Sequence, residues 1–456
     1  MKINRRRFLG GAAVAGLGAA GVYDLVDQLN SRLPKRPVSR RAPAEQHVLD
    51  LSTIESDGVE VVIPPLHSEV ITAKLRETDI RAAQTLLEDA LQELDLKFDP
   101  NPGGLGVTVG WGLPYFDRVR KAAAVHLPFD RRAQKPVLLP TRRFPSDPAQ
   151  TILEENDVVF LLRSDVAAHI DEARSLLFGL DFLHVMSVRR GFAGGGFDGK
   201  QSLPKKLAMA AGVPGADLIP DTAELFLGFT STQKAGLGPR LIANHETLGY
   251  VDLRGGYFHG GTHMHLSHIS EDLEAWYLNF DFGERVLTSF AVGQKAKPNQ
   301  QTVPQAPKDI HDAAQLTSSF ETSRRFGHSA SIQPTSRLQQ DHVGPDGTIY
   351  PKGTAVPQRA DFNTLDNPFA FSAQQERDKW SSDPSAGVHF VVFNPTGDDF
   401  ERNRLAMDGH LPDGTKLDVE QRSRAQGFNS VLTTTHRQNF LVPPRRHRSF
   451  PLAELA

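Results

Sequence analysis

The chain has 456 residues, of which 39% are hydrophobic and 23% are charged. Its 51 Lys and Arg residues against 54 Asp and Glu residues give a formal net charge of -3, so the composition gives no reason to expect a nucleic-acid partner. The absence of cysteine excludes disulfides, iron–sulfur clusters, thiolate metal ligands and cysteine nucleophiles. Any metal must therefore be held by histidine, carboxylate or carbonyl groups.

The first 44 residues have the layout of an export signal followed by a linker. The sequence RRRFL at 5–9 precedes an apolar, Gly/Ala-rich run over 10–26. This RRxFL pattern resembles the twin-arginine signal, although a plain membrane anchor with a chance Arg pair has the same layout. We expect export by the twin-arginine translocase, to a periplasmic, extracellular or membrane-tethered location. A small-x-small cleavage site at 42–44 lies far beyond the apolar run, so the sequence leaves cleavage open.

Residues 45–240 contain the order strand–helix–strand twice. The spacing of apolar residues predicts strands over 59–63, 106–110, 157–162 and 182–188, with helices over 80–94 and 166–177. Two such segments form a ferredoxin-like unit, which is an antiparallel sheet with both helices on one face.

Residues 241–456 repeat this order more loosely. Strands are predicted over 260–269, 388–393 and 438–442, and helices over 271–278 and 398–407. Residues 295–385 are polar and rich in Gln, Pro, Ser and Asp, which indicates either disorder or a long functional loop system. The predicted fold class is therefore α+β, with tandem ferredoxin-like units in a dimeric α+β barrel and helices on the outer faces of the sheets.

This order of elements, together with the export signal, resembles the dye-decolourising (DyP-type) peroxidases, a family of exported haem enzymes that includes the deferrochelatase-like group. The matching stretches are TVGWGLPYF at 108–116, LGFTST at 227–232, GGT at 260–262 and FGER at 282–285. The resemblance implies haem b in the second unit, hydrogen peroxide and a reducing substrate as partners, and peroxide-dependent oxidoreductase activity. The resemblance does not decide whether the protein forms a homo-oligomer.

The resemblance also assigns residues to the haem site. His328, in the stretch GHSASIQ, matches the family's iron ligand, with His342 and His311 as weaker alternatives. A neutral imidazole ligates iron well when its second nitrogen is hydrogen-bonded. Arg359 aligns with the family's distal arginine, which stabilises developing negative charge. A polar loop histidine and an exposed arginine are the alternative interpretations.

The sequence differs from the family at the position of the distal aspartate. Ser231 stands at the collinear place, and Asp198 in GGGFDG lies upstream in a glycine-rich stretch that is typical of a flexible loop. A serine hydroxyl does not act as a base at neutral pH without help. The sequence therefore predicts impaired distal chemistry unless Asp198 or another group acts as the base.

A histidine cluster offers a second hypothesis. His259, His263, His265 and His268 fall within ten residues, and on a strand His263 and His265 share a face. A His-x-His pair on a strand can present two imidazoles to copper, zinc or non-haem iron. The alternative function is thus a non-haem metal-binding or carrier protein, and a polar strand without a ligand is the third interpretation.

Overall fold

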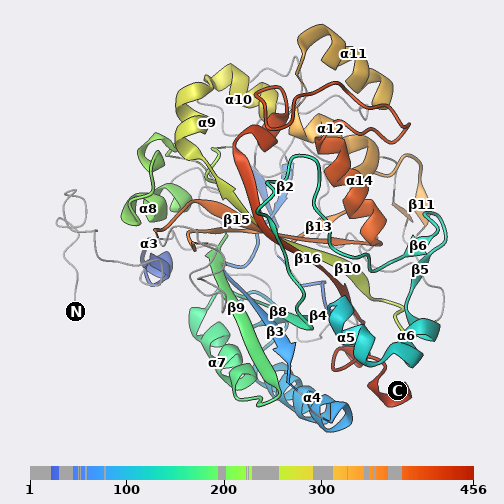
Figure 1. Ribbon diagram of the computed structural model, residues 1–456. Helices are drawn as coiled ribbons and strands as arrows, with labels where there is room; N and C mark the ends of the chain where they lie inside the picture. The colour runs from blue at the N-terminus through green and yellow to red at the C-terminus, as the bar shows by residue number, and fades with distance from the viewer. Residues whose placement is uncertain are drawn as a thin grey trace.

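The computed structural model describes residues 22–29, 45–49, 51, 53–56, 59–76, 79–193, 202–221, 223, 225–228, 256–290, 312–325, 327–343, 349–350, 352, 356–367 and 383–456. Two sheets of similar topology form its centre, and helices cover their outer faces (Figure 1). The domain boundary that we predict at residues 240 and 241 lies outside the described residues.

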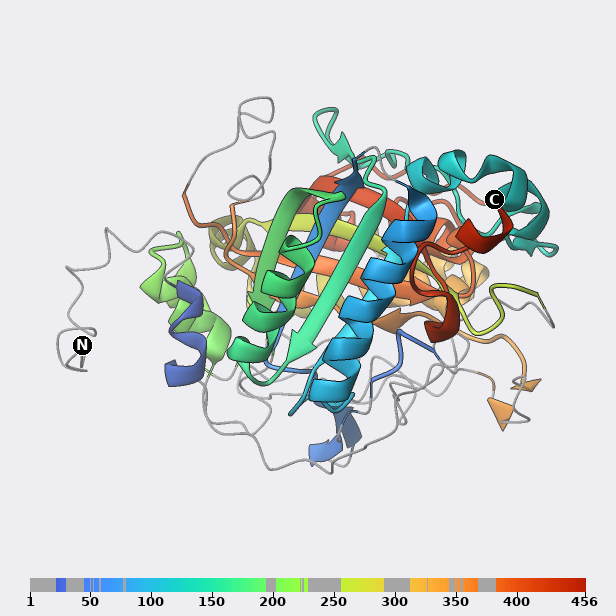
Figure 2. The ribbon, with the colours of Figure 1, turned by 90° about the horizontal axis from the view of Figure 1, so that it is seen from below.

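The first unit is ferredoxin-like. In chain order it consists of β3 (His67–Leu75), α4 (Ile80–Lys97), β4 (Gly106–Trp111), β8 (Val158–Ser164), α7 (Ala167–Phe178) and β9 (Leu183–Phe192). The strands pair in the antiparallel order β9-β3-β8-β4. Both helices lie across one face of this sheet (Figure 2), as the sequence predicts.

Helix α4 shows why the periodicity is a reliable signal here. Its buried residues recur at spacings of three and four and form one apolar face: Ala83, Leu87, Ala90, Leu91 and Leu94. Asp79 caps its start, because the carboxylate accepts hydrogen bonds from the backbone N–H groups of Arg81 and Ala82.

The second unit repeats this topology with a longer insertion. Its elements are β10 (Thr262–Glu271), α9 (Leu273–Asn279), α10 (Phe282–Ser289), α11 (Ala313–Ser323), α12 (His328–Ser336), β13 (Gln358–Arg359), β14 (Phe362–Thr364), β15 (Gly387–Asn394), α14 (Gly397–Met407) and β16 (Leu432–Val442). The strands are ordered β16-β10-β15-β14. Where the structure describes it, the polar stretch 295–385 includes α11, α12 and β14, the second strand of the unit, which the sequence analysis did not identify.

The two sheets close on each other. Strand β14 pairs with β9 through Asn363 and Phe192, and β16 pairs with β4 through Leu441 and Trp111. The interior holds a buried apolar cluster: Val70, Val159, Leu161, Ala193, Met264, Leu266, Phe362, Val391, Phe393, Phe440 and Val442. Because side chains alternate along a strand, the neighbouring residues of β10 and β15 point to the outer face, beneath α12 and α14.

A short strand, β7 (Ile152–Leu153), pairs in parallel with β16 in the main sheet. The other helices and strands lie around the barrel: α3 (Val26–Leu29), β1 (Thr53–Ser56), β2 (Val59–Val62), α5 (Leu113–Arg118), α6 (Arg120–His126), β5 (Phe129–Asp130), β6 (Lys135–Pro136), α8 (Leu203–Ala210), β11 (His342–Val343) and β12 (Ile349–Tyr350). The predicted strand at 59–63 corresponds to β2, which pairs only with β1 and lies outside the main sheet. The first strand of the unit is instead β3, whose Glu69 is buried beside Arg174, so that its sequence does not read as apolar.

The GGT stretch has a steric explanation. Gly260 has φ = 84°, in the left-handed region that favours glycine. A Cβ atom on Gly261 would lie 2.5 Å from the carbonyl oxygen of Val442. Both glycines are therefore needed where the chain enters β10 against β16.

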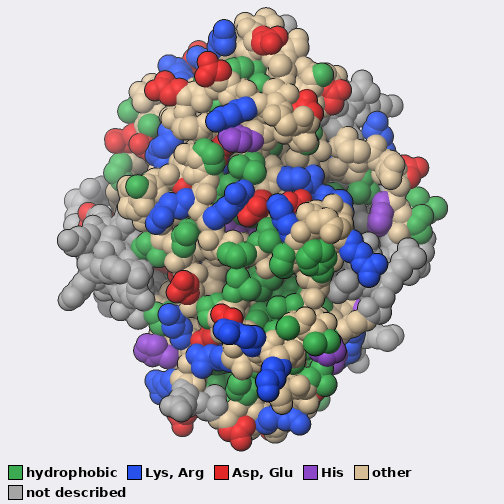
Figure 3. All heavy atoms as spheres, turned by 45° about the vertical axis from the view of Figure 1, so that its right-hand side comes forward, with side chains coloured by type: hydrophobic (Ala, Val, Ile, Leu, Met, Phe, Trp, Pro, Cys, Tyr) green, Lys and Arg blue, Asp and Glu red, His purple; other side chains and the backbone are tan. Residues whose placement is uncertain are grey.

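The surface agrees with the near-neutral net charge. On the face in Figure 3, acidic and basic side chains are interspersed, and hydrophobic side chains gather near the middle. None of the described helices is long and apolar enough to cross a membrane.

Candidate functional site

A cavity of about 220 Å³ lies on the outer face of the second sheet. Its floor is formed by β10, β13, β14 and β15, and α12 and α14 form walls. The apolar part of the lining includes Ile269, Ile332, Val388, Phe390, Val392, Phe400, Met407, Phe428 and Leu432. The cavity therefore has a mostly apolar lining with polar groups at defined points, which is typical of a small-molecule or cofactor site.

His328 is the first residue of α12 and lines this cavity. Its ring packs against Phe428, with the ring centroids 4.8 Å apart. Burial, together with the positive charges of Arg359 and Arg404, lowers the pKa of His328 to about 3. The imidazole is therefore neutral at neutral pH, which is the form that ligates a metal.

Arg359 and Asp361 line the cavity from β13 and from the residues directly before β14. The Arg359 Nε atom lies 3.7 Å from Asp361 Oδ1. The sequence analysis proposed Arg359 but missed Asp361, although its place two residues after Arg359 on an extended strand was a usable signal.

Two further arginines line the cavity beside α14. Arg437 Nη2 donates to Asp147 Oδ1 at 2.6 Å, and Arg404 Nη1 lies 2.9 Å from Asp408 Oδ1. Burial lowers the pKa of Arg437 to about 10, so its guanidinium remains charged at neutral pH. These buried, paired arginines keep positive charge at the cavity wall, and sequence reasoning had no pattern from which to identify them.

Several polar atoms of the lining are buried without a hydrogen-bond partner among the described residues. They are His328 Nδ1, Arg359 Nη2, Glu271 Oε2, Asn403 Oδ1, both side-chain polar atoms of Asn394, and Nε and Nη1 of Arg437. Buried polar groups are normally satisfied, so these atoms are available to hydrogen-bond water or a ligand in the cavity.

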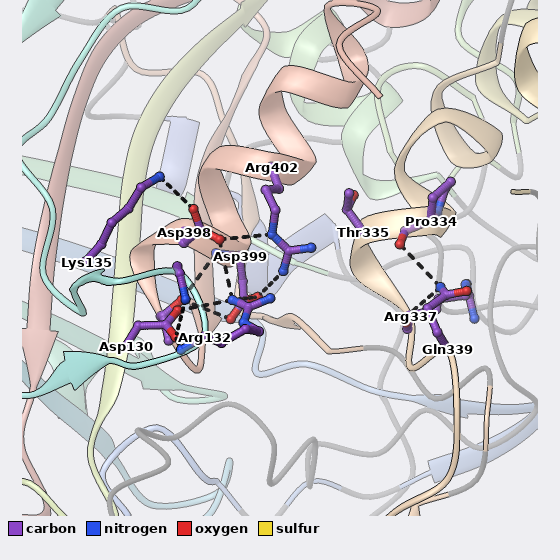
Figure 4. A network of polar contacts seen from close by, with 12 residues as sticks. Asp130, Arg132, Lys135, Pro334, Thr335, Arg337, Gln339, Asp398, Asp399 and Arg402 are labelled. Atoms are coloured by element: carbon purple, nitrogen blue, oxygen red, sulfur yellow. Dashed lines mark hydrogen bonds and ion pairs between the residues drawn. The ribbon is translucent and has the colours of Figure 1, made fainter. Parts of the chain in front are cut away.

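Helix α14 is held in place by ion pairs at its first turn (Figure 4). Lys135 Nζ lies 2.8 Å from Asp398 Oδ1, and Arg132 Nη2 lies 2.8 Å from Asp399 Oδ1. The carboxylates also complement the positive end of the helix dipole. Residues 129–136, which carry β5 and β6, thereby fix the helix that presents Asn403, Arg404 and Met407 to the cavity.

The histidine cluster is divided between the two faces of β10. His263 and His265 share the outer face as predicted, where the His265 ring stacks on Phe400 at a centroid distance of 3.6 Å. His268 points into the barrel, 4.9 Å from the ring of His389. In the part of the chain that the structure describes, no three His, Asp or Glu side chains are arranged to hold a metal ion.

Three predicted residues, Ser231, Asp198 and His311, lie outside the described residues, as does the whole segment between Gly228 and Gly256. His342 is in β11, away from the cavity lining, and His259 lies in the turn before β10. The cavity thus brings together His328 and Arg359 from the sequence prediction.

Comparison with solved structures defines the class of fold. A putative DyP-type peroxidase from Shewanella oneidensis is similar with a TM-score of 0.50 and 14% identity, covering 85% of this chain and 95% of that chain. A variant of DypB from Rhodococcus jostii RHA1, in complex with heme, gives a TM-score of 0.50 and 15% identity, with coverage of 85% and 95%. The protein therefore has the fold of the DyP-type peroxidases, and the predicted α+β class is confirmed.

Sequence comparison assigns the chain to a family of its own description. The chain belongs to the family described as "Family of unknown function (DUF7405)", whose model matches residues 65–444. No curated protein matches it. The chain thus has the DyP-type fold at a sequence identity of 14–15% to these two structures.

Proposed function

We propose that the protein binds haem b in the cavity beneath α12 and α14 and uses it for peroxide-dependent oxidation. The observation that carries this proposal is the meeting of His328 and Arg359, which are distant in the sequence, at one apolar cavity. DyP-type neighbours share the fold, and one of them is a complex with heme.

The lining fits the chemistry of a porphyrin. A porphyrin has a broad apolar plane and two carboxylates, and the cavity offers apolar residues together with Arg404 and Arg437. Arginine is well suited to carboxylates because its planar guanidinium can donate two parallel hydrogen bonds. His328, kept neutral by burial, is the residue that would hold the iron.

The distal roles fall to Arg359 and Asp361. Haem, when bound, would supply the redox chemistry for a two-electron reduction of hydrogen peroxide, and a reducing substrate would replace those electrons. Arg359 stabilises the negative charge that develops on oxygen. Asp361 takes one proton from the peroxide and returns it to the departing oxygen, which leaves as water. In this proposal Asp361, and not Ser231 or Asp198, provides the acid–base group.

We further propose that the protein is exported by the twin-arginine translocase, which transports folded proteins. This proposal rests on the RRRFL sequence at 5–9 and the apolar run that follows it.

A direct test is to purify the protein from cells supplied with a haem precursor and to measure iron, porphyrin and the absorption spectrum. A Soret band with about one iron and one porphyrin per chain is expected. A colourless protein that retains copper or zinc instead would contradict the proposal and favour the His263 and His265 alternative.

A further inference from the structure

Residues 22–29, at the end of the apolar run of the export signal, are packed into the folded protein. The exposed residues of this segment are Asp24, Asp27 and Gln28. Four residues are almost fully buried, with exposed fractions of 0% for Val22, 8% for Tyr23, 7% for Leu25 and 0% for Val26, and Leu29 is partly buried. They join the buried apolar cluster that contains Leu207 of α8 and Trp276 of α9, and α3 lies beside α8 in both ribbon views (Figures 1 and 2).

Tyr23 also makes specific hydrogen bonds where the segment packs against the sheet. Its hydroxyl accepts a hydrogen bond from the backbone N–H of Leu365 at 3.0 Å and donates to the carbonyl oxygen of Arg190 at 2.9 Å. The Thr364 Oγ1 atom lies 3.0 Å from the same hydroxyl. The tyrosine therefore bridges β9 and the end of β14.

Two charged side chains, Asp27 and Arg190, add further contacts between the segment and the strands. Asp27 Oδ1 lies 2.8 Å from His67 Nε2, at the start of β3. The Arg190 guanidinium lies over the Tyr23 ring, 5.0 Å from its centroid, at a distance where a cation is attracted to an aromatic face. The segment thus contacts three strands by apolar packing, hydrogen bonds and charge.

The segment 22–29 contacts a strand that also lines the cavity. Strand β14 has only three residues, Phe362–Thr364, and its Asn363 lines the cavity while Thr364 contacts Tyr23. A strand this short has few ladder hydrogen bonds of its own, so additional contacts at its end contribute to its order.

We propose that residues 22–29 are a permanent part of the mature protein, packed against α8, β9 and β14, where they hold β14 against the barrel. Processing at 42–44 does not discard this segment. The inference does not require haem. It uses the export proposal only in describing residues 22–29 as part of a signal, and the docking itself rests on the contacts of these residues.

The first test is the mass and N-terminal sequence of the exported protein, isolated without denaturant. We expect residues 22–29 to be present, either in the intact chain or as a peptide that copurifies with it. A stable mature protein that begins after residue 29 and carries no such peptide would overturn the inference. Failure of export alone would contradict the signal proposal and leave the docking measurable in the cytoplasmic protein.

The second test uses amide hydrogen exchange of the full chain. Tyr23→Phe removes the acceptor of the Leu365 N–H, and we expect exchange across 362–366 to become about tenfold faster. Asp27→Asn, which keeps the apolar packing, is expected to produce a smaller change in the same direction at β3. Asp24→Asn is the matched control, because Asp24 is exposed on the same segment. Unchanged exchange at Leu365 in a folded Tyr23→Phe variant would contradict the docking.

Discussion

Arg359 and Asp361 line the same cavity two residues apart, with Arg359 Nε 3.7 Å from Asp361 Oδ1. The extended backbone between them turns both side chains toward one side of the sheet. This pair gives the site a cation beside a carboxylate. In the proposed haem site, Arg359 and Asp361 would serve as the distal pair, which the family resemblance places at separate points of the sequence.

If Asp361 is the acid–base group, Asp361→Asn should lower the rate of the peroxide reaction of the haem-loaded protein by roughly 100- to 10,000-fold. Asp361→Glu should restore part of the rate, because it keeps a carboxylate. Stopped-flow absorbance after addition of peroxide measures this rate. Glu271, whose carboxyl group also lines the cavity, provides the comparison: a loss of rate in Glu271→Gln with a normal rate in Asp361→Asn would assign the role to Glu271.

The buried histidines predict a loss of stability in acid. Burial lowers the pKa of each of these side chains: His47, His263, His265, His268, His328 and His389. Because the folded pKa lies below the unfolded value of about 6.5, their contribution to stability is present above pH 6.5. It is lost as the pH falls from there toward the folded values near 3 that His47, His263 and His328 share.

Three buried carboxyls act in the opposite direction. Burial raises the pKa of Glu69 and Asp366 to about 7 and of Glu271 to about 8. Their contribution is present below the unfolded pKa of about 4 and is lost as the pH rises through 7 to 8. Six histidines outweigh three carboxyls below pH 6, so the free energy of unfolding of the apo-protein should be greatest at about pH 6 to 7. Urea unfolding across pH 4 to 9 measures this dependence. A stability that increases steadily toward pH 5 would contradict these assignments.

A substitution of Phe393 tests whether the two sheets enclose a packed core. It is completely buried among residues of both units, on the central strand β15 between β10 and β14. Phe393→Ala should lower the free energy of unfolding by about 3–5 kcal/mol, because it leaves a cavity in a packed core. The midpoint of a denaturant curve measures this loss, and a change below about 1 kcal/mol would be incompatible with the closed barrel.

Export can be tested in cells. Replacing Arg5 and Arg6 with Lys should retain the protein in the cytoplasm, because the twin-arginine receptor reads the Arg pair. Fractionation followed by immunodetection measures the outcome, and unchanged export of the variant would remove the twin-arginine assignment.

The sequence predicted elements whose apolar periodicity is strong. Helices α4 and α7 and strands β8 and β15 were identified because their buried residues repeat at spacings set by the helix or lie in continuous apolar runs. The predicted strand over 388–393 corresponds to β15, which lies between β10 and β14 in the sheet.

The elements that form the cavity carried weaker signals. Helix α12 consists largely of Ser, Gln and Thr around His328, and β14 is three residues long, so neither has a period that can be recognised. Arg437 lies in a strand that contacts Asp147 nearly three hundred residues earlier in the chain. Only the tertiary structure brings such residues together. The family resemblance supplied His328 and Arg359, and it could not supply Asp361 because its motif places the aspartate elsewhere.

Haem binding through His328 is tested most directly by titrating the apo-protein with hemin and following the Soret absorbance of the wild type, His328→Ala and His263→Ala. We predict saturation at one hemin per chain for the wild type and for His263→Ala, and loss or strong weakening of the Soret band for His328→Ala. His263 is a suitable control because it is a buried histidine on β10 that does not line the cavity. A wild-type protein that gives no saturable Soret band, or a His328→Ala variant that binds hemin with the wild-type spectrum, would contradict the account.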